Sequence, residues 1–109
     1  SKRLQLEARR QSARQGIHLE IEVAHSAFRR AEHELDSALE ARNLVREWVQ
    51  IAQEEFDLDR SQIKELVSAF EALAATEEAY YRSIFDVNIA LAELERVVGI
   101  NLRVAGETQ

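Results

Sequence analysis

The chain has 109 residues, with no proline and only three glycines, and its formal net charge is −6. This length predicts one structural unit, and the composition favours helices over strands and turns. The acidic balance argues against a general nucleic-acid-binding protein, and no stretch of about 18 uncharged apolar residues predicts a membrane-spanning helix.

Residues 1–16 are predicted to form a basic helical lead-in. Between Ser1 and Gln15 five basic side chains stand against one acidic side chain, a net of +4, so the rest of the chain carries −10. We expect this end to be a solvated helix terminus or to contact an acidic surface. Gly16 should then kink the helix or cost about 1 kcal/mol relative to alanine.

From Ile17 to Phe56 a seven-residue apolar repeat predicts a helix that packs as a coiled coil. The repeat has two positions in each heptad, and eleven of its twelve sites are apolar. The first position holds Ile17, Ala24, Ala31, Ala38, Val45 and Ala52. The second position holds Ile21, Phe28, Leu35, Arg42, Val49 and Phe56. Arg42 therefore places one charge in the seam, the line along which the two helices are expected to pack.

A second arm repeats the pattern as far as Val98. One of its positions holds Ile63, Phe70, Glu77, Ile84, Leu91 and Val98, and the other holds Leu66, Leu73, Tyr80, Val87 and Leu94. Pairing position n with position 119 − n aligns the two arms and brings Arg42 opposite Glu77. The sequence thus predicts an all-α fold, a long antiparallel two-helix coiled-coil hairpin over residues 17–98. The polar pair should act as a register lock more than as a source of stability.

The tip of the hairpin is predicted near residues 57–61. Asp59 fits the N-cap of the second arm, and Gln62, three residues later, completes a capping-box pattern. Leu58 and Ile63 occupy the positions at which a hydrophobic staple would close the turn.

The second arm is expected to end at Gly99, which suits a left-handed C-cap. Ile100 would then fold back on Leu94. Residues 99–109 are predicted to form a C-terminal tail.

Both arms carry apolar side chains that the predicted seam does not use. They are Val23, Ala27, Leu39, Ala41, Leu44, Trp48 and Ile51 in the first arm, and Val67, Ala69, Ala74, Tyr81, Ala90 and Val97 in the second. An isolated pair of helices would leave these side chains in water. They predict lateral packing against further helices in a bundle or barrel, unless the alanines reflect helix propensity alone.

The run from Ala79 to Gly99 resembles the last periplasmic helix of the TolC-type outer-membrane efflux proteins. That family combines a tyrosine-rich turn, an Asp-Tyr-Asn triplet, an alanine and a closing Leu-Glu-Arg-x-x-Gly, and here Val87 replaces the tyrosine of the triplet. Residues 41–49, with Arg46-Glu47-Trp48, resemble the preceding descending helix, and residues 56–69 resemble the tip turn and the helix start. The resemblance covers nearly the whole chain and is most specific in the second arm.

This resemblance implies a homotrimer with a β-barrel in the outer membrane and an α-helical tunnel in the periplasm. The chain would supply one hairpin of that tunnel, a segment of an α-helical barrel, and would touch the membrane only through barrel regions outside this sequence. The hairpin tip would dock a periplasmic adaptor (membrane fusion) protein of an efflux pump. Leu58, Asp59, Arg60 and Ser61 are the predicted contact residues, with Asp59 in place of the glycine that the family's turn usually carries.

The family also narrows its tunnel near the tip with acidic side chains. Glu65 matches one such position, and Ser68 matches a position at which some members carry a second acid, so both are pore-constriction candidates. A ring of Glu65 side chains from three subunits would favour cations at the entrance. Alternatively, Glu65 is one solvated acid among many.

The residues do not predict an enzyme, a cofactor or a metal centre. His18, Glu22 and His25 share a helix face, but a di-iron bundle needs a second Glu-x-x-His motif and further glutamates. No nucleophile–base pair or glycine-rich phosphate loop is evident. The leading hypothesis is a periplasmic tunnel segment of an efflux channel in the outer membrane; the alternative is a stand-alone soluble coiled-coil interaction module.

Overall fold

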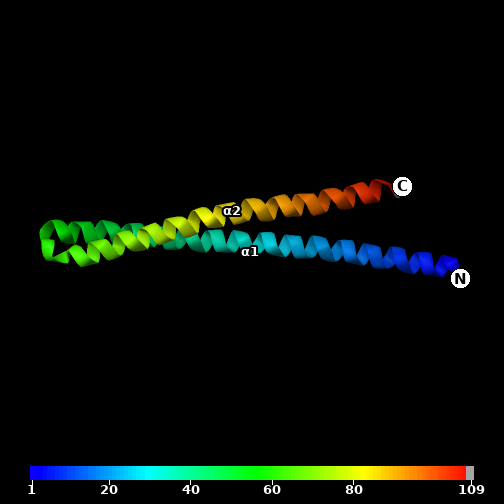
Figure 1. The fold of residues 1–109 in the computed structure, drawn as a ribbon, viewed down its shortest axis with the longest axis horizontal. Coiled ribbons are helices and arrows are strands. Elements are labelled where there is room, and N and C mark those ends of the chain that lie inside the picture. Colours follow the sequence, from blue (N-terminus) through cyan, green and yellow to red (C-terminus); the bar gives the residue numbers. More distant parts are fainter. Residues whose placement is uncertain (108–109) are drawn as a thin grey trace. The chain divides into compact units, whose positions relative to one another are not determined.

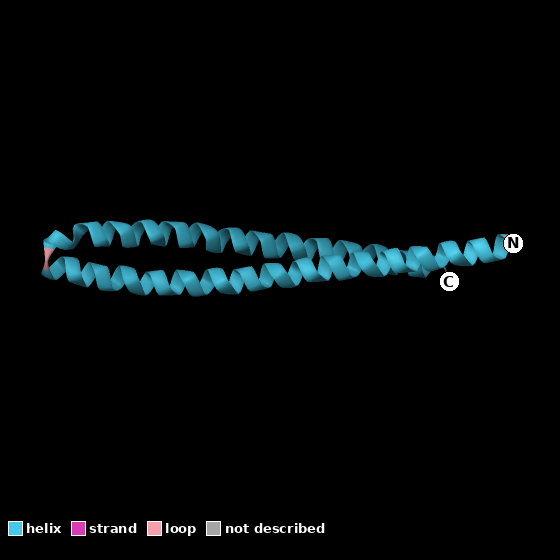
Figure 2. Cartoon of the chain, turned by 90° about the horizontal axis from the view of Figure 1, so that it is seen from below, coloured by secondary structure: helices cyan, strands magenta, loops and turns pink. Residues whose placement is uncertain are grey.

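Two long helices make up the fold of residues 1–107, the part of the chain that the structure, a computed structural model, describes. Helix α1 spans Lys2–Leu58 and helix α2 spans Ile63–Glu107 (Figure 1). A short 3-10 helix, η1, at Arg60–Gln62 joins them at the turn drawn in pink in Figure 2. The predicted all-α helical hairpin is confirmed.

The helices form two compact units, each built from stretches of both α1 and α2. The tip unit comprises Ala31–Val87 and contains the turn, whereas the end unit comprises Ser1–Arg30 together with Asn88–Gln109. Because each unit pairs two segments that lie far apart in sequence, each contains its own length of helix–helix seam.

The turn at the tip begins where α1 ends. Asp59 takes an extended conformation, with φ −146° and ψ 107°, and its carboxylate accepts a hydrogen bond from the Ser61 backbone N–H at 3.0 Å. The Gln62 N–H donates to the Asp59 carbonyl at 3.1 Å. The predicted N-cap is therefore confirmed, although the segment that it caps is η1, which runs into α2. Since this backbone is one that any residue adopts, the turn does not require a glycine.

The predicted hydrophobic staple across the turn is wrong. Leu58 is 90% exposed and Ile63 is 46% exposed, so neither side chain is packed away at the turn. The reason is geometric: Phe56 is the last α1 residue in the seam, and a residue two positions further along a helix points to a different face. Leu58 therefore projects into solvent at the tip.

The predicted α1 seam is confirmed along its whole length. All twelve predicted seam positions of α1 are buried or half-buried, and Trp48 is the only other α1 residue that is not exposed. Ala31 and Ala52 are buried in the tip unit, and Ala24 is buried in the end unit. Alanine occupies four of the six sites at the first seam position, and these small side chains let the partner helix approach closely.

The predicted α2 seam is half wrong. The position occupied by Leu66, Leu73 and Tyr80 is confirmed, because these side chains are buried or half-buried. Among the residues predicted for the other position, Glu77 and Ile84 are half-buried as expected, but the remaining ones are exposed, namely Ile63, Phe70, Leu91 and Val98. The residues one place earlier in sequence are buried or half-buried throughout and line the seam; they are Ala69, Thr76, Ser83, Ala90 and Val97.

Side-chain size explains this shift of the α2 seam. Ala69 is completely buried, and it packs with Ala52 and Leu66 in the core of the tip unit. Two hydroxyls are tolerated in the seam because they bond to their own helix: Thr76 Oγ1 donates to the carbonyls of Ala72 and Leu73, both at 3.0 Å, and Ser83 Oγ donates to Ala79 O at 2.9 Å. The bulkier residues, such as Phe70, flank the seam.

The predicted end of α2 at Gly99 is also wrong. The helix passes through Gly99 and continues to Glu107, and no glycine among the described residues has a positive φ. Asn101 lies at the next seam position and is half-buried, whereas Ile100 is 46% exposed and does not fold back. Continued packing along α2 therefore outweighs the weak helix propensity of one glycine. Helix α1 likewise runs through Gly16.

Candidate functional site

The tip presents four predicted contact residues to solvent. Leu58, Asp59, Arg60 and Ser61 are all exposed, and Leu58 is the most exposed large apolar side chain of the described residues. The guanidinium of Arg60 lies over the Phe56 ring, with Cζ 5.6 Å from the ring centroid. The tip thus exposes an apolar side chain next in sequence to a capping carboxylate and a cation, a combination that suits binding to a partner helix.

Hydrogen bonds at the tip fix the charge of Asp59. The Ser61 hydroxyl and then the Ser61 backbone N–H, with a smaller contribution from the Gln62 side chain, lower the pKa of Asp59 below its ordinary value. Donors that bond to a carboxylate favour its ionised form. The turn therefore holds a negative charge at neutral pH in a defined orientation.

Glu65, the predicted constriction residue, is held in place by the chain's single tryptophan. The Trp48 indole Nε1 donates a hydrogen bond to Glu65 Oε1 at 3.1 Å, which links α1 to the first turn of α2. Glu65 and Ser68 are both exposed. The indole orients the carboxylate of Glu65 without neutralising it, because tryptophan is an uncharged donor. The role of Glu65 and Ser68 in a pore stays a prediction.

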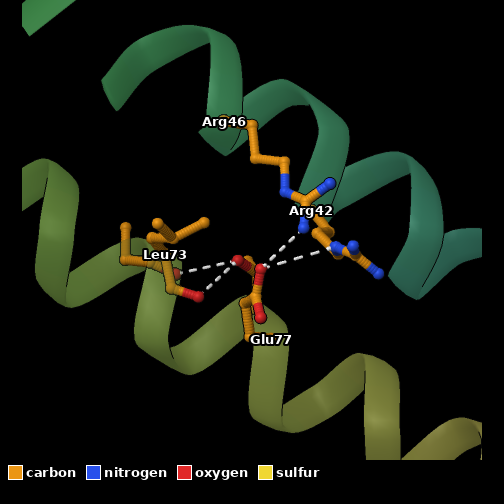
Figure 3. Close-up of polar contacts among 6 residues, drawn as sticks. Arg42, Arg46, Leu73 and Glu77 are labelled. Carbon is orange, nitrogen blue, oxygen red and sulfur yellow. Dashed lines mark hydrogen bonds and ion pairs between the residues drawn. The ribbon is translucent and has the colours of Figure 1, made fainter. Parts of the chain in front are cut away.

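The structure brings Arg42 and Glu77 together. Arg42 Nε lies 3.6 Å from Glu77 Oε1, and their side chains are 15% and 31% exposed (Figure 3). Glu77 accepts a shorter hydrogen bond, at 3.0 Å, from Arg46 Nη2, one turn further along α1. The Arg42 guanidinium also stacks over the Tyr80 ring, with Cζ 4.4 Å from the centroid. We call these four residues the polar layer.

Two features of the polar layer matter for recognition. One carboxylate serves two guanidiniums, so the layer keeps one positive charge in excess. Arg46 is 50% exposed, so its remaining N–H groups are accessible to an acceptor from outside the hairpin. The role of Arg42 and Glu77 as a register lock stays a prediction.

An apolar edge runs along α1 in the tip unit. It consists of Leu44, Trp48, Ile51 and Leu58, which lie three, four or seven residues apart and therefore share one helix face. Leu44 and Ile51 are 62% and 54% exposed, and Trp48 is half-buried. We call this set the α1 edge. It lies on the side of the hairpin at which Trp48 reaches Glu65.

A second apolar edge runs along α2 in the same unit. It consists of Ile63, Val67, Phe70 and Tyr81, which are between 46% and 60% exposed. Phe70 is seven residues before Glu77, so this α2 edge lies on the side of the hairpin at which Arg46 reaches Glu77. Arg46 and Trp48 point to opposite flanks of α1, and the two edges consequently lie on opposite sides of the tip unit.

Other candidate chemistry gains little from the structure. His18 Nε2 lies 3.2 Å from Glu22 Oε1, and no three metal-ligating side chains converge within the described residues. A shallow depression over Leu6, lined by Lys2, Gln5 and Arg9, lies where every side chain of residues 1–16 is exposed. No helix in the described part of the chain is long and apolar enough to cross a bilayer.

Comparison with protein-family models, curated proteins and solved structures finds no match for this chain. The resemblance to TolC-type channels therefore remains a prediction from the residues that carry it.

Sequence reasoning missed three contributors to the site. Arg46 and Tyr80 join the Arg42–Glu77 pair, and Trp48 anchors Glu65. A signal for Arg46 was present, because a residue four positions after Arg42 lies beside it on the helix surface. Sequence spacing gives no such signal for the hydrogen bond between Trp48 and Glu65, because the donor lies on α1 and the acceptor lies on α2.

Proposed function

We propose that this chain is a wall segment of the periplasmic tunnel of a trimeric TolC-like outer-membrane efflux channel. The observation that carries the proposal is the pair of exposed apolar edges on opposite sides of the tip unit, beside a seam that is already filled. A hairpin that retains apolar side chains on both flanks is suited to stand between neighbours in a ring of helices. The chain's own part in export is structural and involves no chemical step.

The tip supports a docking role within this proposal. Leu58 projects at the end of α1, where a partner protein can cover it, and Arg60 and the ionised Asp59 add polar contacts around it. Protein interfaces commonly bury an apolar anchor inside a polar rim. The partner that we propose is the helical hairpin of a periplasmic adaptor protein.

Glu65 and Ser68 are the proposed lining near the entrance. Trp48 holds the Glu65 carboxylate at a set height above the turn, so copies of Glu65 in a ring of subunits would lie at one level. Rings of carboxylates favour cations over anions. We therefore propose an entrance that favours cationic compounds.

The test uses the intact parent gene in a bacterium that lacks a channel of this kind. We expect Leu58→Asp to raise the accumulation of a fluorescent cationic dye to the level of the channel-less strain, while the trimer remains in the outer membrane. Leu19→Asp is the matched control, because Leu19 is 60% exposed but lies in the end unit, and this variant should export normally.

The proposal is refuted if Leu58→Asp exports as well as the unmodified channel. It is also refuted if the parent gene encodes neither an export signal nor outer-membrane barrel strands.

The second candidate is a stand-alone coiled-coil interaction module. The observation that favours it is that a capped turn and a filled seam are both contained within this chain. A parent reading frame no longer than this chain would select the module over the channel.

A further inference from the structure

The positions of the two apolar edges determine how copies of this hairpin can associate. A two-fold dimer covers the same surface on both copies. Such a dimer would bury the α1 edge or the α2 edge and leave the other in water. Contact of the α1 edge of one copy with the α2 edge of the next covers both, and it is a head-to-tail arrangement.

The heights of the edge residues along the tip unit match for this contact. Ala52 and Ala69 pack in one cluster, so the adjacent Ile51 and Phe70 lie at nearly the same height on their helices. Two copies that point the same way with no axial offset therefore bring Ile51 of one copy level with Phe70 of the next.

Charge complementarity supports the same register. Glu47 is exposed beside the α1 edge, three residues after Leu44 and four before Ile51, and it has no ion-pair partner among residues 1–107. The polar layer beside the α2 edge has an excess of positive charge, because Arg42 and Arg46 share the single carboxylate of Glu77. Arg46 and Glu47 are adjacent on α1, so copies without axial offset place them at the same height.

We propose that a second copy of this chain docks its α1 edge onto the α2 edge, with its Glu47 supplying a second carboxylate to Arg46, which shares Glu77 with Arg42. The contact is heterologous and leaves a free edge at each end, so it propagates until a ring closes. This inference rests on the proposed function, in which the apolar edges pack against neighbouring helices. It deepens that function by naming a second copy of this chain as the neighbour.

Engineered disulfides test the contact, because the chain contains no cysteine. The Ile51→Cys and Phe70→Cys variants are prepared separately, mixed, and oxidised under mild conditions. Both replaced side chains are about half exposed, so the helical fold should persist, which circular dichroism verifies. We expect the mixed disulfide to form at least about tenfold faster than either self-disulfide, because docking raises the effective concentration of the two thiols.

Two controls sharpen the result. Asn43→Cys is exposed on the opposite flank of α1, and in place of Ile51→Cys it should give only slow crosslinking to Phe70→Cys. Adding Glu47→Lys to the Ile51→Cys variant should slow the mixed crosslink about twofold to fivefold, as expected for a surface ion pair. Adding Arg46→Glu to the Phe70→Cys variant should then restore the rate.

Three outcomes overturn the inference. The first is preferential disulfide formation between two copies of the Ile51→Cys variant or two copies of the Phe70→Cys variant. The others are a mixed-crosslinking rate equal to that of the Asn43→Cys control, and no recovery of the rate when Glu47→Lys is combined with Arg46→Glu. Its failure is distinguishable from that of the proposed function. Loss of export in Leu58→Asp without head-to-tail crosslinking would leave the channel proposal standing with other neighbours. Head-to-tail crosslinking with normal export in Leu58→Asp would leave a self-associating module.

Discussion

Replacing Glu77 with leucine should destabilise the hairpin more than replacing Arg42 with leucine. Without Glu77, the guanidiniums of Arg42 and Arg46 lose their shared carboxylate, and Arg42 is only 15% exposed. Without Arg42, Glu77 keeps its 3.0 Å bond to Arg46, and leucine adds apolar surface to the seam. Arg46 therefore makes the loss of Glu77 the more costly of the two changes.

The magnitudes follow from burial. Removing one partner of a fully buried ion pair costs about 3–5 kcal/mol. Arg46 is half exposed and Glu77 is 31% exposed, so water screens the leftover charges and we expect about 1–2 kcal/mol for Glu77→Leu. Arg42→Leu should fall within about 0.5 kcal/mol of the unmodified chain, because the lost stacking on Tyr80 is offset by apolar burial. The double variant should resemble Arg42→Leu.

Thermal unfolding followed by circular dichroism measures these differences. A change of 1 kcal/mol corresponds to roughly 3–6 °C in Tm for a chain of this size, so Glu77→Leu should be clearly resolved. Glu78→Leu is the matched control, because Glu78 pairs with Arg82 at 2.8 Å on the surface and both side chains are about 70% exposed. It should change the stability by less than about 0.5 kcal/mol.

The reasoning is refuted if Glu77→Leu costs no more than Arg42→Leu or no more than Glu78→Leu. Additive effects in the double variant would also refute it, because residues that share one network should couple.

Three further outcomes are expected. Ala69→Leu should destabilise the hairpin by about 1–3 kcal/mol through overpacking. It should cost more stability than Phe70→Ala, and thermal melts that show the reverse order would indicate that Phe70, as predicted from sequence, is the seam residue. The pKa of Asp59 is lowered in the fold, so its stabilising contribution is present above pH 3.8, its ordinary value, and is lost as the pH falls through the lower folded value. Asp59→Asn, which keeps an acceptor for the cap, should therefore flatten the pH dependence of Tm between pH 6 and 2, and an unchanged slope would contradict the assignment. Glu65→Ala should shift the emission of Trp48, the chain's only tryptophan, whereas a spectrum identical to that of the unmodified chain would count against the hydrogen bond.

The polar layer was partly predictable. Arg42 and Glu77 stand out as the only charges in two apolar repeats, and a common register aligns them. The repeat identifies Tyr80 only as a seam residue, because sequence gives no sign that a guanidinium will stack on its ring. The link between Trp48 and Glu65 was not predictable, because it depends on the rotation of two helices about their own axes.

By itself, the sequence determined the hairpin: the heptad repeat set two helices, Asp59 set the turn, and the twelve α1 sites set which face of that helix is covered. Only the tertiary structure decided which of two adjacent α2 faces enters the seam and where α2 ends. Periodicity cannot distinguish Ala69 from Phe70, because both are apolar and one residue of rotation keeps the same period. The choice depends on how closely two backbones can approach, and a buried alanine permits an approach that a phenylalanine forbids.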